Sequence, residues 1–375
     1  MTYSASMAVQ RLFPTDEGHD LLDLTREIVA KELRPKVDAA EAAAALGEEF
    51  PTDIFRTLGR AGLLSLPHPE EFGGGGQPYE VYLQVVEEIA SAWMSVAVGV
   101  SVHSLTAFPV TTFGSPAQRE ALLPGMLSGD QLGAYGLSEP LAGSDVAAMT
   151  TRATRDGAGD DGAGDDGATD DPAYRIRGRK AWISHAGHAD YYTTFARTSD
   201  DGGRGISCFI VPGDATGLSF GTPEKKMGLH CDTVREVSYE DVEVESGRRI
   251  GAEGQGMSIA LAALDAGRLG ISAAATGLAQ SALDVASAYA VERRQFGRAI
   301  ADNQGLAFLI ADMEAAVGGA RAAYLHAARL KDAGRPFSKE AAVAKLLATD
   351  AAMRVTTDAV QVLGGAGYTQ DFPVE

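Results

Sequence analysis

The sequence predicts an α+β multidomain protein in which a β-rich region separates two helical regions. Apolar residues recur at helical spacing from residue 16 to about residue 127, and again after residue 256. Between about 129 and 247, short alternating or β-branched runs are bounded by Gly, Asp and Pro. We therefore expect an N-terminal all-helical domain over 1–128, a central β-domain over 129–247 and a C-terminal helical bundle over 248–375.

The N-terminal region has apolar stripes typical of amphipathic helices. Helix starts are expected at 14–17 and at 51–53, because Thr or Asp can accept hydrogen bonds from free backbone N–H groups there. Acidic residues at these positions also suit the positive end of the helix dipole. The stripes are formed by Leu21, Leu22, Leu24, Ile28, Val29 and Leu33, by Ile54, Leu58, Leu63 and Leu64, and by Tyr82, Val85, Val86 and Ile89.

In the central region, strands are expected at 174–178, 191–196, 207–211 and 234–239. An insertion over 156–171 contains a five-residue repeat of Gly, Ala, Thr and Asp. Such a segment cannot bury a core and its charges repel one another, so a disordered hairpin loop is predicted there. The repeat lacks the ligand spacing and the closing Glu of an EF-hand, which argues against calcium binding.

The C-terminal region predicts a long alanine-rich helix over 259–278, then helices around 283–291, 306–330 and 339–363. Gly and Pro at 296–297 and 334–336 mark the connections between them. Four helical segments of this length can pack as a bundle.

Composition excludes several classes of partner. The chain has 32 Lys and Arg against 51 Asp and Glu, a formal charge of −19, so nucleic acid or an anionic membrane surface would repel it. Two cysteines are too few for a disulfide framework, and the seven histidines show no metal-ligand spacing. The N-terminus does not resemble a signal peptide, and the most apolar stretch, 93–102, is too short to cross a bilayer. We expect no metal and a cytoplasmic location.

Two polar segments of the β-rich region could carry chemistry. The segment 135–146 ends a strand and places hydroxyls and backbone N–H groups in one turn, which suits an extended polar ligand. The segment 178–187 sets the Trp182 indole beside the Ser184 hydroxyl, which suits a planar heterocycle. Considered singly, a plain loop and a buried core tryptophan are the simpler interpretations. The chain has no nucleophile elbow, P-loop or Rossmann fingerprint.

Together with four further segments, these two closely resemble the acyl-CoA dehydrogenase family. The further segments are 226–228 (Lys-Met-Gly), 265–268 (Asp-Ala-Gly-Arg), 292–297 (Glu-Arg-Arg-Gln-Phe-Gly) and 361–368 (Gln-Val-Leu-Gly-Gly-Ala-Gly-Tyr). All six occur in the family's order, in a match that runs from about residue 16 to residue 375. The resemblance implies a β-barrel-like central domain, a C-terminal four-helix bundle and FAD held without a Rossmann fold.

The resemblance also implies an activity. It is FAD-dependent α,β-dehydrogenation of an acyl-CoA thioester to the trans-2-enoyl-CoA, with electrons passed to an electron-transfer flavoprotein. The implied assembly is a homotetramer whose subunits share flavins. Gly267 and the segment 95–105 favour the short-chain or short-branched-chain branch by resemblance.

The site residues follow from the same resemblance, position by position. Three residues are implied to bind substrate: Ser144, Asp265 and Arg268. The alternative interpretation of Asp265 and Arg268 is that they form an ion pair with each other within one helix. For Arg293 the alternative is a surface ion pair with Glu292 or a neighbouring helix. The implied FAD-binding residues are Tyr135, Leu137, Ser138, Gly143, Ser144, Trp182, Ile183, Ser184, Arg293, Gln295, Phe296, Gln304, Gln361, Gly364 and Gly365.

No catalytic base is assigned by the resemblance. In most relatives the catalytic Glu lies beyond the position that matches 373–375, and a subset carries it where this sequence has Gly267. Glu375 matches a non-catalytic position. We expect either that a final helix bearing the base is missing from the chain or that the protein is a non-catalytic FAD-binding partner subunit. A third interpretation is an oxidase of the same fold that uses oxygen.

Overall fold

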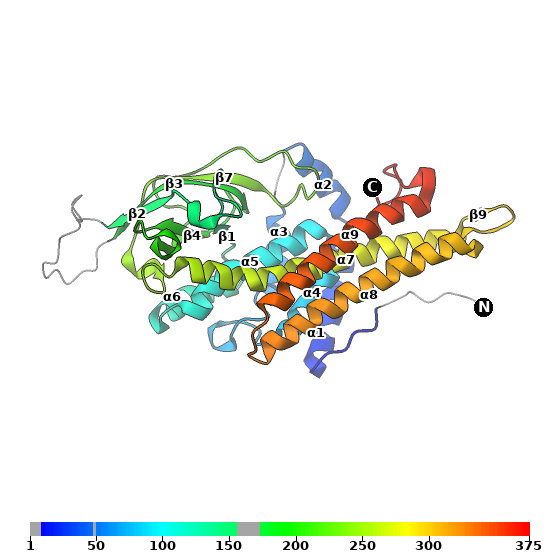
Figure 1. Cartoon of the computed structure of the whole chain (residues 1–375), viewed down its shortest axis with the longest axis horizontal. Coiled ribbons are helices and arrows are strands. Elements are labelled where there is room, and N and C mark those ends of the chain that lie inside the picture. Colours follow the sequence, from blue (N-terminus) through cyan, green and yellow to red (C-terminus); the bar gives the residue numbers. More distant parts are fainter. Residues whose placement is uncertain (1–8, 48–49, 156–172) are drawn as a thin grey trace, which may run out of the picture. The chain divides into compact units, whose positions relative to one another are not determined.

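The computed structural model describes residues 9–47, 50–155 and 173–375 (Figure 1). They form two compact units, each assembled from separate stretches of chain. Unit 1 contains the described residues up to Val37, then Gln77–Val98 and Arg268–Glu375. Unit 2 contains Asp38–Gly76 and Gly99–Gly267. The acidic repeat predicted to be a disordered loop at 157–171 lies outside the described residues.

Unit 1 is helical, as periodicity predicted. Its first helix begins where expected, because the Thr15 side chain accepts a hydrogen bond from the Gly18 N–H at 3.2 Å. Its elements are α1 (Asp16–Ile28), a π-helical turn (Val29–Leu33), α4 (Tyr79–Ala90), most of α7 (Gly256–Glu292), α8 (Gln304–Asp332), α9 (Ser338–Leu363) and a 3₁₀ turn (Gly364–Ala366).

The prediction of two separate helices over 259–278 and 283–291 was wrong, because α7 is one continuous helix. Gly277 does not end it. A Cβ at Gly277 would come within 2.1 Å of the Glu87 carbonyl oxygen of α4, so this glycine allows α4 to pack closely against α7. Helices α7, α8 and α9 then lie side by side (Figure 1) around a core of buried alanines with Leu283, Met313 and Leu363.

Unit 2 also contains helices and parts of helices. Helix α3 begins at Thr52 as predicted, but Pro51 occupies the cap position and makes no side-chain capping bond, so the predicted side-chain cap was wrong. Ser115 and Gln118 form a complete capping box at the start of α6. The helices are α2 (Val37–Ala45), α3 (Thr52–Arg60), most of α5 (Met94–Phe113) and α6 (Pro116–Leu127), with 3₁₀ turns at Glu70–Phe72, Val146–Ala148, Gly202–Gly205 and Ser246–Arg248.

A mixed sheet forms the rest of unit 2, with strand order β6-β7-β3-β2-β4-β5-β8 and β1 parallel to β4. The four predicted strands are confirmed as β3, β4, β5 and β7, although β3 and β7 each continue for several further residues. The strands are β1 (Gly133–Gly136), β2 (Arg152–Arg155), β3 (Tyr174–Ser184), β4 (Tyr191–Arg197), β5 (Ile206–Pro212), β6 (Leu218–Phe220), β7 (Val234–Val244) and β8 (Arg249–Ile250).

Among the described residues, two helices are long and apolar enough to cross a membrane by length and composition alone, α5 and α7. The stretch 93–102 was expected to be too short to cross a bilayer. The helix that contains most of it is longer, because α5 continues through Pro109 to Phe113. However, 67% of the most apolar window of α5 and 50% of that of α7 is buried inside the protein. The apolar window of α5 is thus mostly buried, as in a core helix.

Candidate functional site

Trp182 is held in a strained conformation with its indole exposed. Its φ of +58° lies in the left-handed region that bulky residues avoid, and its side chain is 58% exposed. The strain arises where the register between β3 and β7 shifts between Lys180 and Ile183. A buried core tryptophan is thus excluded, and a large aromatic face is presented outward at a local cost in energy.

The 137–142 loop lies directly beside Trp182. The Ala181 N–H donates to the Ser138 carbonyl at 2.9 Å, which connects the loop to β3 one residue before the indole. Glu139 and Ala142 close the loop through two reciprocal backbone hydrogen bonds, of 3.0 and 3.1 Å. The predicted positions Ser138 and Trp182 therefore come together in unit 2, together with Ile183 and Ser184 at the end of β3.

The Ser184 hydroxyl donates to an Asp232 carboxylate oxygen at 3.0 Å. Asp232 is buried, and its other carboxylate oxygen has no hydrogen-bond partner. Burial raises the pKa of Asp232 and the Glu41 carboxylate adds to this, whereas the Ser184 hydrogen bond and Lys226 oppose it. While Asp232 is ionised, the Ser184 proton is committed to it, so the Ser184 oxygen is left to accept a hydrogen bond.

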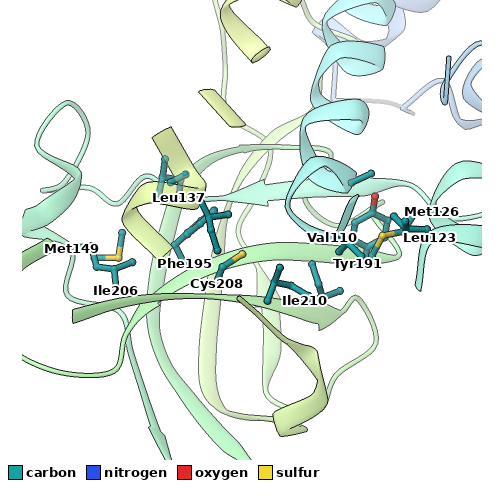
Figure 2. Close-up of a cluster of buried hydrophobic side chains, with 14 of the residues drawn as sticks. Val110, Leu123, Met126, Leu137, Met149, Tyr191, Phe195, Ile206, Cys208 and Ile210 are labelled. Atoms are coloured by element: carbon teal, nitrogen blue, oxygen red, sulfur yellow. The ribbon is translucent and has the colours of Figure 1, made fainter. Parts of the chain in front are cut away.

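Two predicted positions point inward. Figure 2 shows the Leu137 side chain in the hydrophobic cluster that includes Phe195, so its backbone is the part able to meet a ligand. The Tyr135 ring packs on Phe195 with centroids 5.2 Å apart, and its hydroxyl donates to the Ala260 carbonyl at 3.4 Å. Burial raises the pKa of Tyr135. Both residues support the floor of the site.

Gly143 and Ser144 directly follow the 137–142 loop and are exposed. A Cβ at Gly143 would meet nothing within 4 Å, so packing within this chain does not demand a glycine there. The absence of a side chain leaves the backbone open to a ligand.

The second group of predicted residues lies in unit 1, at one end of the α7–α9 bundle. Strands β9 (Arg294–Gln295) and β10 (Arg298–Ala299) form a hairpin after α7. Its turn residues, Phe296 and Gly297, have φ values of +52° and +79°, and Phe296 is 96% exposed. A phenylalanine held at positive φ in full exposure is a second strained position among the predicted residues.

The same end of the bundle carries the end of α9 (Figure 1). Gln361, Gly364 and Gly365 are exposed there, and Gln304 is exposed at the start of α8. Gly364 has φ +60° and ψ −130°, a conformation that is essentially restricted to glycine. A Cβ at Gly364 or Gly365 would meet nothing within 4 Å.

Each group, taken by itself, fits one part of a flavin dinucleotide. The exposed indole and the hydroxyls of Ser138 and Ser184 suit a planar heterocycle with polar edges. The exposed Arg293 guanidinium and the open Gly364–Gly365 backbone suit a pyrophosphate. Asp265 and Arg268 lie one turn apart on α7, which agrees with their predicted spacing.

Some residues that shape the site were missed. Lys180 and Glu139 form a buried ion pair beneath the loop, and Asp232 orients Ser184. Side chains alternate between the two faces of a strand, and Lys180 falls on the same inward face of β3 as Tyr174 and Ile176. A lysine at a position expected to be buried is the sequence signal from which Lys180 could have been predicted.

A cavity of about 630 Å³ in unit 2 is lined by none of the predicted flavin residues. It lies among Phe50, His188, Lys225, Lys226 and Arg235. In the part of the chain that is described, no cluster of three or more His, Cys, Asp and Glu side chains could hold a metal ion.

Comparison with known proteins gives a consistent answer. The sequence matches models of the acyl-CoA dehydrogenase N-terminal domain over 15–130, the middle domain over 134–242 and the C-terminal domain over 254–375. It is 39% identical over 363 residues to a short-chain specific acyl-CoA dehydrogenase of Clostridium acetobutylicum, covering 96% of this chain and 91% of the relative.

Solved structures agree. The butyryl-CoA dehydrogenase of Megasphaera elsdenii superposes with a TM-score of 0.89 at 36% identity, covering 97% of this chain and 92% of that chain. A chain from a structure described as the electron transferring flavoprotein of Acidaminococcus fermentans also gives 0.89, at 37% identity and the same coverage. The protein belongs to the acyl-CoA dehydrogenase family, flavoprotein oxidoreductases that act on CH–CH groups.

Proposed function

We propose that this protein binds FAD and oxidises a short-chain acyl-CoA to the trans-2-enoyl-CoA, passing the electrons to an electron-transfer flavoprotein. The observation that carries the proposal is the exposed, strained indole of Trp182 beside the Ser138 loop. The short-chain substrate is supported by the names of the relatives from Clostridium and Megasphaera, and the acceptor by the match to the Acidaminococcus structure.

Different residues are proposed to bind different parts of FAD. Trp182 offers an apolar face to the ring, while the Ser138 and Ser184 hydroxyls reach polar edges. Arg293 would give a charge-assisted fork to the pyrophosphate of a neighbouring subunit's FAD, and Gly364 and Gly365 would let the backbone approach it. Through the remaining predicted positions, Gln295, Phe296, Gln304 and Gln361, the bundle end would contact the flavin of a neighbouring subunit.

When bound, the flavin supplies the acceptor for the β-hydride. Ser144, Asp265 and Arg268 are proposed to contact the acyl-CoA. Removal of the α-proton requires a carboxylate base, and donors on the thioester oxygen must stabilise the enolate that develops. None of the predicted site residues is assigned as this base.

An anaerobic titration tests the function. If the chain supplies a carboxylate base, the protein reconstituted with FAD is expected to lose visible flavin absorbance on addition of butyryl-CoA, and to regain it on addition of an oxidised electron-transfer flavoprotein. Palmitoyl-CoA, as the long-chain control, should bleach it far less.

Other outcomes of this titration point elsewhere. A flavin that binds but stays oxidised means that the base is lacking, as expected for a missing final helix or for the non-catalytic partner subunit. Rapid reoxidation by air alone favours the oxidase. A protein that takes up no FAD contradicts the proposal.

We further propose a homotetramer. Helix α9 has an exposed apolar stripe, spaced so that its members share one face: Val343, Leu346, Leu347 and Met353. Water-exposed apolar surface of this kind is characteristic of a protein–protein interface.

Leu347→Glu is expected to dissociate the tetramer, because it would bury a charge in the interface. Lys345→Glu is the control, since Lys345 is exposed on the same helix but points away from the stripe. Size-exclusion chromatography with light scattering measures the mass. Unchanged mass for Leu347→Glu would place the interface elsewhere.

A further inference from the structure

A buried ion pair lies beneath the loop beside Trp182. The Lys180 ammonium donates to a Glu139 carboxylate oxygen at 2.8 Å, and the exposed fractions of the two residues are 0% and 3%. Glu139 also accepts from the Thr150 N–H at 2.7 Å, the Thr150 hydroxyl at 2.9 Å and the Thr151 N–H at 3.0 Å. Lys180 donates in addition to the Leu137 carbonyl at 3.1 Å. The pair is therefore fully hydrogen-bonded.

These bonds hold Ser138 from both sides. Lys180 binds the carbonyl of the residue before it and the carboxylate of the residue after it, while the Ala181 N–H binds the carbonyl of Ser138 itself. Trp182 follows immediately on the same strand. The relative position of the serine and the exposed indole thus depends on two adjacent residues of β3.

The charges persist at neutral pH. Burial alone would raise the pKa of Glu139, but Lys180 and the Thr150 and Thr151 hydrogen bonds outweigh it and lower that pKa. Burial lowers the pKa of Lys180, and Glu139 opposes this change.

Stability alone does not account for such a pair. Removing two charges from water is costly, and replacing a buried ion pair with apolar residues of similar volume is often neutral or stabilising. A satisfied buried network does, however, fix one geometry, because any shift leaves a buried polar group unpaired.

We propose that Glu139 and Lys180 are positioning residues for the cofactor: their ion pair sets the Ser138 loop and the Trp182 indole in the arrangement that binds the flavin. Neither side chain reaches the surface, so they act through the loop and the strand. The inference rests on the proposed function for its ligand, but the arrangement it describes exists in the protein without FAD.

The test compares the unaltered protein with Glu139→Leu/Lys180→Met, which keeps the volume and removes the bonds to Leu137, Thr150 and Thr151. The control is Arg179→Met, on the same strand, which removes an exposed ion pair with Glu236 of 3.6 Å. Three quantities are measured: the urea midpoint, the dissociation constant of FAD, and acrylamide quenching of tryptophan fluorescence without FAD. Acrylamide quenching reports on Trp182, because the other tryptophan, Trp93, is only 2% exposed and is shielded from the quencher.

The double variant is expected to unfold cooperatively but at a lower urea midpoint, because Leu137, Thr150 and Thr151 lose hydrogen-bond partners. It should bind FAD at least about tenfold more weakly and show altered quenching. Arg179→Met should change none of the three. A folded double variant with FAD affinity within about twofold of the unaltered protein and unchanged quenching overturns the inference.

Two further outcomes are informative. If no version binds FAD but quenching changes only in the double variant, the proposed function fails and the positioning role stands. If the double variant does not fold, Glu139→Gln decides, because it keeps acceptors for Thr150 and Thr151 while removing the charge. Unaltered FAD affinity and quenching in Glu139→Gln then overturn the inference.

Discussion

Replacing Glu87 with Gln is expected to lower the free energy of unfolding by about 3–5 kcal/mol. The Glu87 side chain is 1% exposed and accepts from Arg11 at 3.1 Å and from Arg321 at 2.9 Å. It also accepts from the Tyr324 hydroxyl. Without the negative charge, two largely buried guanidinium groups lose their shared counter-ion, and among the described residues only Arg11 keeps a carboxylate, that of the more exposed Glu88. Removing one partner in this way is the costly way to break a buried ion pair.

Glu88→Gln is the matched control. Its carboxylate lies 3.3 Å from Arg11 and 3.6 Å from Arg26, and its side chain is 17% exposed. Water screens this pair, so we expect a loss of about 1 kcal/mol or less. Urea unfolding of both variants measures the difference. Equal losses would show that the Glu87 network contributes no more than a surface pair.

The Glu87 effect should depend on pH in a known direction. Burial raises the pKa of Glu87, but Arg11 and Arg321 outweigh it, so the pKa is lowered below its ordinary value in the folded protein. The stabilisation is therefore complete above the carboxyl's unfolded pKa and is lost as pH falls through the lowered folded pKa. The gap between the unaltered protein and Glu87→Gln should shrink on acidification. A gap that stays constant down to acid unfolding would contradict this.

Local signals predicted the fold because helix and strand periods are local properties. The order of helices, strands and helices follows from spacing alone, and Thr15 caps α1 as expected. The error at α7 has the same origin: Gly277 lies against the Glu87 carbonyl, a contact between residues far apart in the sequence that no helical window contains.

The site was harder to predict for the same reason. The exposure of Trp182 depends on a register shift against β7, more than 50 residues further along. The Glu139–Lys180 pair spans 41 residues and the Glu87–Arg321 pair spans 234. Residue types along the chain identify the candidates by resemblance, but only the paired strands and helices decide which of them are buried partners and which face outward.

Arg293→Gln is expected to weaken FAD binding by about tenfold to a hundredfold, because a hydrogen bond to a charged group contributes about 1.5–3 kcal/mol. Arg294→Gln is the control: the residue is adjacent, equally charged and exposed, but is not a predicted FAD position. Titration of the flavin-free protein with FAD gives both dissociation constants.

Comparing the Arg293→Gln and Arg294→Gln variants also distinguishes direct hydrogen bonding of the pyrophosphate from a general electrostatic attraction. The protein carries a formal charge of −19, so an anionic pyrophosphate is repelled at long range and needs locally concentrated positive charge. The hairpin supplies it with Arg293, Arg294 and Arg298. If the hairpin acts only through its field, both variants lose equal affinity and salt abolishes the loss. If Arg293 binds the pyrophosphate directly, its variant alone shows the larger loss, and much of that loss persists at high salt because a bidentate contact excludes water.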